Sequence, residues 1–216
     1  MVIRSVIDLN GFGIHAADGD IGMVEELYFD DVTWTIRYLV VQTGGWLADR
    51  RVLISPMSVR EADWQNRRIL MSLTQDQVRH SPNVDTTKPI SRQYETEFHQ
   101  HYGWDVYWLG RGVWENKYRS EDPQNPHLRS TKEVIGYHIL ANDGEIGHAA
   151  DFLFDDESWQ IRYMLIDTIQ WRFGKKVIVS PTLIKAVFWA ERQIAVDLER
   201  EAIKTGPEFD PKTLTK

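Results

Sequence analysis

The strongest constraint on the fold of this chain is an internal repeat with a constant offset of 125 positions. Asp18–Gly22 returns as Asp143–Gly147, and Phe29–Asp31 returns as Phe154–Asp156. The register holds without an insertion from Gly11/Gly136 to Pro82/Pro207, through the matched pairs Trp34/Trp159, Ile36–Tyr38/Ile161–Tyr163, Trp46/Trp171, Ser55-Pro56/Ser180-Pro181 and Trp64/Trp189. Such a register over glycines, prolines and tryptophans indicates two copies of one structural unit.

Each copy has the pattern of short strands joined by tight turns. Asp18-Gly19 is typical of a hairpin turn, and Gly22 indicates a bulge or a close approach of two backbones. The expected strands of the first copy are residues 21–29, an alternating strand with Trp34, Ile36, Tyr38 and Val40 on one face, and residues 51–55 and 67–73. Many short strands with close turns favour a small barrel, because closure removes exposed edges.

A short helix is expected at the end of each copy. Thr74–Gln77 fits a capping box and Pro82 stops the chain soon after, while residues 199–206 form the counterpart before Pro207. We therefore predict a mainly β fold of two small barrels in tandem, with residues 1–82 and 134–216 as the barrels. A unit of roughly 70 residues is marginal alone, so we expect the copies to pack together.

The connector, residues 83–133, belongs to neither copy in this interpretation. Ser91 is the expected N-cap of a helix near residues 91–103, with Tyr94, Phe98 and Tyr102 on one stripe. Further aromatic residues follow at Trp104, Tyr107, Trp108, Trp114 and Tyr118. These rings either fill the space between the barrels or form an exposed partner-binding surface, in which Trp104 and Trp108 are the candidate contacts.

Composition excludes several classes of protein. The chain has no cysteine, so disulfide frameworks and thiol nucleophiles are excluded. Its formal net charge of -7 argues against a large nucleic-acid interface. No apolar run reaches the ~20 residues of a membrane span, and the N-terminus lacks a signal-peptide pattern. We expect a soluble cytoplasmic protein, and leave open a peripheral contact with the inner membrane.

No constellation in the sequence favours catalysis or metal binding. Asp30-Asp31 and Asp155-Asp156 are adjacent carboxylates, which we expect to be solvated and to shape turns rather than to act as an acid and base pair. His99 and His101 would point about 200° apart on a helix, which does not suit one metal ion. We therefore predict that the protein is not an enzyme and has no metal or cofactor.

Four matched residues are candidates for binding a partner. Arg37 and Arg162 are either outward arginines that cover an aromatic neighbour, or anchors on the barrel wall. Trp46 and Trp171 are either lids over a barrel end or interface anchors. The basic pairs Arg50-Arg51, Arg67-Arg68 and Lys175-Lys176 either belong to an ordinary solvated surface or attract phosphate or an acidic partner.

Together, these motifs resemble the PRC-barrel domain. The resemblance rests on the Gly-x-Ile-Gly strand, Phe-Asp-Asp, Trp-x-Ile-Arg-Tyr, the Trp-bearing loop and Ser-Pro, in both copies. The family is typified by the cytoplasmic domain of the photosynthetic reaction centre H subunit and includes the C-terminal domain of RimM-type ribosome maturation factors. It implies docking modules with no catalytic residues attached to the motif.

The function expected from the sequence is a non-catalytic protein-binding adaptor or scaffold. The resemblance also implies two alternatives, which are an accessory subunit in photosynthetic or membrane electron transport and an RNA-processing or ribosome-assembly factor. The expected partner is a protein, and a homo-oligomer is compatible with the sequence.

Overall fold

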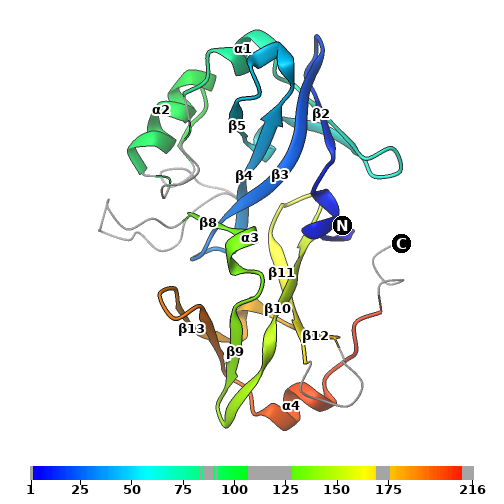
Figure 1. Cartoon of the computed structure of the whole chain (residues 1–216), viewed down its shortest axis with the longest axis vertical. Helices are drawn as coiled ribbons and strands as arrows, with labels where there is room; N and C mark the ends of the chain where they lie inside the picture. Colours follow the sequence, from blue (N-terminus) through cyan, green and yellow to red (C-terminus); the bar gives the residue numbers. More distant parts are fainter. Residues whose placement is uncertain are drawn as a thin grey trace. The chain divides into compact units, whose positions relative to one another are not determined.

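The computed structural model divides the chain into two compact units, which we describe separately (Figure 1). The N-terminal unit is Leu9–Ser130, and the C-terminal unit combines Met1–Asp8 with Thr131–Lys216. The structure describes residues 2–82, 84, 90, 92–106, 128–168 and 176–210. This division differs from the boundaries expected from the sequence, because the first eight residues belong with the second copy and the connector helix belongs with the first.

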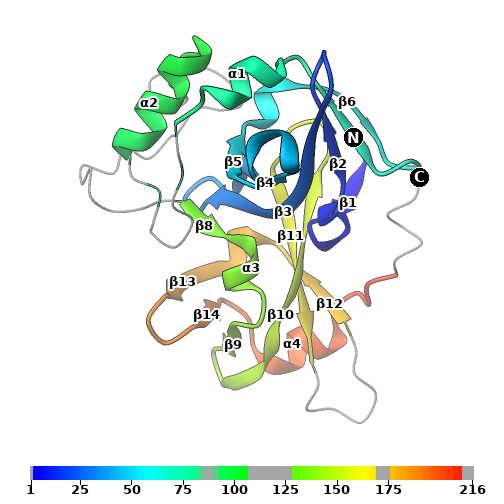
Figure 2. The same ribbon diagram turned by 45° about the horizontal axis from the view of Figure 1, so that its top comes forward.

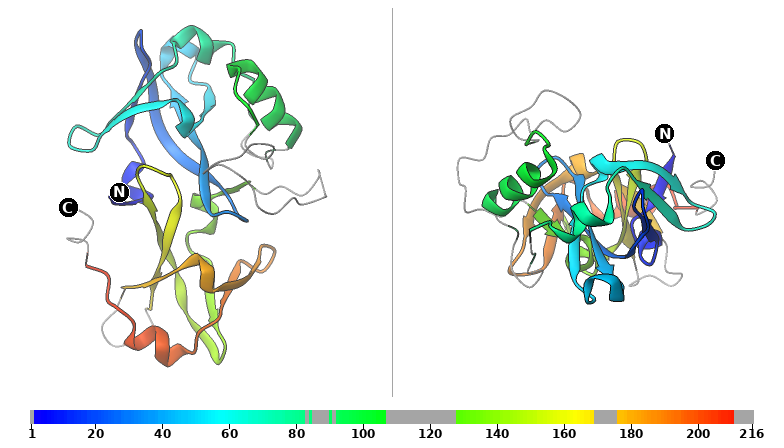
Figure 3. Two further views of the ribbon diagram at one scale, coloured as in Figure 1. Left: turned by 180° about the vertical axis from the view of Figure 1, so that it is seen from behind. Right: turned by 90° about the horizontal axis from the view of Figure 1, so that it is seen from above.

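The N-terminal unit is built on one mixed sheet with the strand order β5-β4-β3-β2-β7-β6, and β8 also pairs with β3. Its strands are β2 (Gly13–His15), β3 (Asp20–Asp30), β4 (Thr35–Thr43), β5 (Arg51–Ile54), β6 (Val59–Asp63), β7 (Arg68–Met71) and β8 (Leu128–Ser130). Its helices are the 3-10 turns η2 (Gly45–Leu47) and η3 (Pro56–Ser58), and the α-helices α1 (Gln75–Arg79) and α2 (Arg92–Tyr102). The hairpin of β6 and β7 is drawn in cyan in Figure 3.

The C-terminal unit repeats this topology in the order β12-β11-β10-β9-β14-β13, with β1 paired to β10. Its strands are β1 (Ile3–Ser5), β9 (His138–Ala141), β10 (Gly144–Asp155), β11 (Ile161–Asp167), β12 (Lys176–Val179), β13 (Ile184–Phe188) and β14 (Gln193–Val196). Helices α3 (Thr131–Val134) and α4 (Arg200–Thr205) and the 3-10 turn η4 (Pro181–Leu183) complete it, and a further 3-10 turn, η1 (Ile7–Leu9), spans the boundary of the two units. The predicted mainly β fold with two barrel-like copies is confirmed.

Each sheet is completed by a strand that precedes the other copy in the sequence. β1 pairs with the end of β10, from Ile3 opposite Asp155 to Ser5 opposite Leu153. β8 pairs with the end of β3 in the same way, from Leu128 to Ser130 (Figure 2). β1 and β8 are themselves separated by the repeat offset of 125 positions, so the exchange of strands is reciprocal.

Matched polar contacts hold these two exchanged strands. Arg4 pairs with Asp156 at 3.3 Å, and Arg129 pairs with Asp31 at 2.9 Å. The Ser5 hydroxyl donates to Asp151, and the hydroxyl of Ser130 donates to Glu26 at the equivalent position. Burial raises the pKa of Asp151, and the hydrogen bond from Ser5 opposes this effect.

A β-bulge at Arg37 changes the alternation predicted for β4. Tyr28 pairs with Tyr38 but Phe29 pairs with Ile36, so Arg37 has no partner in the ladder. Neighbouring residues of β3 point to opposite faces, so Tyr38 and Ile36 lie on opposite faces as well. The expectation that Ile36 shares a face with Tyr38 is therefore wrong, and the reason is the extra residue of the bulge.

Several local predictions are confirmed. The Thr74 capping box is present, with the side chains of Thr74 and Gln77 bonded to each other's backbone amides. Gly22 marks a close approach, because a Cβ there would lie 2.0 Å from the Gln42 carbonyl oxygen. The two acidic pairs do shape turns, but Asp30 and Asp155 are buried rather than solvated as expected. None of the described helices is long and apolar enough to cross a membrane.

Candidate partner-binding site

The outer wall of the N-terminal unit holds the connector helix. The term outer wall denotes the sheet face formed by five buried residues, which are Tyr28, Tyr38, Val40, Leu53 and Leu128. Phe98 of α2 is fully buried against this wall, and Ile90 packs beside it. In Figure 1, α2 lies next to β4 and β5 of the same unit.

The predicted aromatic stripe of α2 forms this contact. Phe98 makes edge-on contacts with Tyr38 at 5.2 Å and with Tyr102 at 4.9 Å between ring centroids. Tyr94 stacks on Phe98, and Trp104 stacks on Tyr102. Burial raises the pKa of Tyr102 to about 12. The described aromatic residues of the connector thus cover the first copy's own sheet.

A buried polar cluster lies at the centre of this contact. The Tyr38 hydroxyl donates to Glu95 at 3.1 Å and lies 3.2 Å from His99 Nε2, and all three side chains are buried. His99 Nδ1 faces the Asp105 carbonyl oxygen at 2.9 Å, so Nδ1 carries a hydrogen. Burial lowers the pKa of His99, and the nearby positive charge of Arg37 acts in the same direction.

Arg37 is buried at the bulge of β4. Its guanidinium lies 3.6 Å from the Asp30 carboxylate and donates to the Thr33 hydroxyl at 3.2 Å. The other oxygen of Asp30 accepts the backbone amides of Val32 and Thr33, which fixes the turn. The side chain is only 1% exposed, so Arg37 is not an outward arginine, which is one of the two alternatives that the sequence left open.

Arg162 has the matching position in the C-terminal unit and a different environment. It pairs with Asp155 at 3.2 Å, but its side chain is 39% exposed. Burial, the largest single influence, raises the pKa of Asp155, yet the hydrogen bonds from Glu157, Ser158 and Arg162 together bring it below the ordinary value. The two predicted arginines are therefore equivalent in the sheet but differ in their access to solvent.

Trp46 is partly buried and folds back on its own sheet. Its Nε1 donates to the Ile21 carbonyl oxygen at 2.7 Å, and the Arg79 guanidinium lies 5.7 Å from the ring centroid. These contacts resemble the lid that the sequence left open as one of two alternatives. Trp104 is on the first unit, as described above, whereas Trp171 and Trp108 lie outside the described residues.

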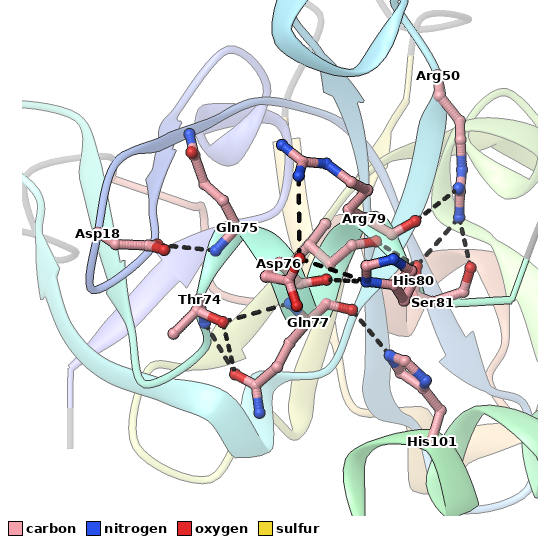
Figure 4. A network of polar contacts seen from close by, with 11 residues as sticks. Asp18, Arg50, Thr74, Gln75, Asp76, Gln77, Arg79, His80, Ser81 and His101 are labelled. Atoms are coloured by element: carbon pink, nitrogen blue, oxygen red, sulfur yellow. Dashed lines mark hydrogen bonds and ion pairs between the residues drawn. The ribbon is translucent and has the colours of Figure 1, made fainter.

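A polar network around α1 holds the start of the connector (Figure 4). The Arg50 guanidinium donates to the carbonyl oxygens of Arg79 at 3.2 Å and Ser81 at 2.6 Å. His101 of α2 bonds the Gln77 carbonyl oxygen of α1 at 2.8 Å. Arg50 therefore has a structural use, and so has Arg51, which pairs with Glu25 at 2.7 Å.

Three residues of this site were not predicted from the sequence. Tyr38, Glu95 and His99 meet only because α2 lies across β4, and no local pattern links positions so far apart. The stripe of Tyr94 and Phe98 predicts which face of α2 is buried, and His99 lies beside that stripe. Among the described residues, no cluster of three or more potential metal ligands occurs.

Comparison with known families gives one match. Residues 4–78 match the model of the PRC-barrel domain. A comparison with curated proteins found no match. The matched range begins within β1 and ends within α1, and the described second copy has the same order of strands.

Proposed function

Because residues 4–78 are a PRC-barrel domain, and the second copy repeats its topology, we propose that the protein is a non-catalytic adaptor that holds a protein partner. The proposal assigns binding to the outer walls of the barrel-like units. It leaves the interior of each unit as packed core, with residues such as Ile36, Leu39 and Val41 fully buried.

One observation carries the proposal, which is that α2 lies on the outer wall of the N-terminal unit. Phe98 is fully buried between Tyr38, Tyr102 and Trp104. An amphipathic helix laid on an apolar surface is a recurring mode of protein recognition. Buried aromatic anchors of this kind provide much of the binding energy at protein interfaces. The wall is thus a surface that binds a helix within this chain.

The process that the adaptor serves depends on its partner. A membrane electron-transport complex would fit the family's reaction centre relative, and a ribosomal particle would fit its maturation-factor relative. The net charge of -7 favours a protein surface over RNA in either case. We therefore place protein binding first and leave the process to be decided by the identity of the partner.

Affinity capture of the tagged full chain, combined with cross-linking, tests this function. We expect one partner to be recovered in a constant ratio from native lysate and to cross-link to residues of an outer wall. Gel filtration of the same lysate should place the chain above the mass of its purified form. Recovery of the chain alone, at its purified mass, would contradict the proposal.

A further inference from the structure

The two units present matched outer walls, of which only one is covered by a described helix. The wall of the C-terminal unit is formed by the residues 125 positions after those of the first wall, with Ile3 in place of Leu128: Ile3, Leu153, Tyr163, Leu165 and Ile178. The strand pairing confirms that the two walls are equivalent, because Leu153 pairs with Tyr163 and Leu165 pairs with Ile178. The first wall has the same pairs, Tyr28 with Tyr38 and Val40 with Leu53.

The two walls differ in exposure at their equivalent positions. Tyr163 is 37% exposed, whereas Tyr38 is 1% exposed beneath α2. Ile3 and Ile178 are half-buried, whereas Leu128 and Leu53 are buried. Leu153 and Leu165 stay buried at the centre of the second wall. The exposure of the second wall therefore lies at Tyr163, with Ile3 and Ile178 half-buried.

We propose that the outer wall of the C-terminal unit docks an amphipathic helix of a partner protein, which presents a carboxylate and, three positions later, an aromatic ring. This inference rests on the proposed function and names its surface and ligand. The helix chemistry is taken from α2, in which Glu95 bonds the Tyr38 hydroxyl and Phe98 fills the wall.

Charge supports a carboxylate in the partner helix. The Arg162 side chain is 39% exposed and pairs with Asp155 through one terminal nitrogen. A guanidinium has five N–H donors, so further donors remain to meet a carboxylate. Tyr163 is the repeat counterpart of Tyr38, whose hydroxyl donates to Glu95. A phenol and a guanidinium from neighbouring, partly exposed positions of β11 suit an acidic, aromatic helix.

A peptide of residues 90–106, with a side-chain staple joining the exposed positions 97 and 101, provides the probe. It carries the contacts of α2 and is added to the purified full chain. We expect micromolar binding by fluorescence anisotropy and slower hydrogen–deuterium exchange in β11 and β12. Replacing the phenylalanine of the peptide by alanine should weaken binding at least tenfold. Replacing its glutamine at position 100, which is exposed on α2, should leave binding unchanged.

Variants of the full chain locate the binding surface. Tyr163→Ala and Arg162→Glu should each weaken peptide binding at least tenfold. Phe188→Ala is the matched control, because Phe188 is a similarly exposed aromatic residue on β13 at 43% exposure. Circular dichroism checks that the variants keep the fold. Tyr163→Phe keeps the ring but loses the hydroxyl, so it should bind the peptide more tightly than Tyr163→Ala does.

The outcomes separate this inference from the function it rests on. Absence of binding by the stapled peptide, or protection in β4 in place of β11, would overturn the wall assignment. A partner that is captured equally well by wild type, Tyr163→Ala and Arg162→Glu would overturn it while the adaptor function stands. If the chain captures no partner but binds the peptide on β11, the adaptor function is contradicted. The assignment of the wall as a helix-binding surface is then still supported.

Discussion

At the scale of single residues, two glycines show why certain positions of the repeat must match. A Cβ at Gly22 would lie 2.0 Å from the Gln42 carbonyl oxygen, and one at Gly147 would lie 2.1 Å from the Asp167 carbonyl oxygen. Backbone atoms of a paired strand cannot move aside as a flexible side chain would. The sequence predicted this close approach, because a glycine inside a strand usually marks a bulge or a place where two backbones meet closely.

We expect Gly22→Ala and Gly147→Ala each to destabilise its own unit by at least about 1–3 kcal/mol. Hydrogen–deuterium exchange of β3 or β10 should report which unit has lost stability. Gly44→Ala is the control, because no atom lies within 4 Å of a Cβ there. Equal effects of Gly22→Ala and Gly44→Ala would contradict the steric explanation.

The buried imidazole of His99 makes the docking of α2 sensitive to pH. Burial lowers its pKa in the folded state, while the unfolded chain titrates near about 6.5. As the pH falls through that range, the imidazole of His99 is protonated in the unfolded state but stays neutral in the folded state. The stability of the docked helix is therefore complete above about pH 6.5 and decreases as the pH falls towards the folded-state pKa.

We expect the exchange protection of α2 to decrease between about pH 7.5 and pH 5, after correction for intrinsic exchange rates. His99→Gln removes the titration, so its protection should depend less on pH than that of the wild type. The difference between the two proteins should be constant above about pH 7.5, where the imidazole is neutral in both states. A parallel decrease in both proteins would assign the effect to other groups.

At the scale of elements, the connector helix shows both the reach and the limit of sequence patterns. The spacing of Tyr94, Phe98 and Tyr102 predicted the buried stripe of α2, and the capping box predicted the start of α1. Neither pattern states which sheet the stripe covers, because that depends on tertiary packing. The bulge at Arg37 could not be predicted from the sequence either, because an alternating sequence fits a regular strand equally well.

Phe98→Ala should detach α2 from the outer wall of the N-terminal unit. Removing a buried phenylalanine costs about 3–5 kcal/mol, and Phe98 is the central ring of the cluster. We expect loss of exchange protection in α2 and exposure of Tyr38 on β4. Gln100→Ala, on the exposed side of the same helix, should keep both. Retained protection in Phe98→Ala would show that other contacts hold the helix.

At the scale of the whole molecule, the main finding is the reciprocal exchange of β1 and β8. The sequence carried a signal for it, because Arg4-Ser5 and Arg129-Ser130 obey the repeat offset. The expected boundaries nevertheless placed residues 83–133 outside both copies. Three residues are too few for a periodic pattern, and strand exchange leaves no local signature in a sequence. The repeat therefore predicted the two units, but not which segments complete them.

Removal of residues 1–5 should destabilise the copy that is distant in sequence. We expect faster exchange in β10, which loses its β1 neighbour and the Ser5 bond to Asp151, and little change in β3. Ser130→Pro is the reciprocal control, since it disturbs β8 and should speed up exchange in β3 instead. Faster exchange in β3 after the N-terminal truncation would rule out the exchanged pairing.

The exchanged strands also decide what a single copy of the repeat would contain. A segment of residues 1–82 keeps β1 and lacks β8, whereas a segment of residues 128–216 keeps β8 and lacks β1. Each segment would therefore carry the strand that completes the sheet of the other, and neither would contain all the strands of its own sheet.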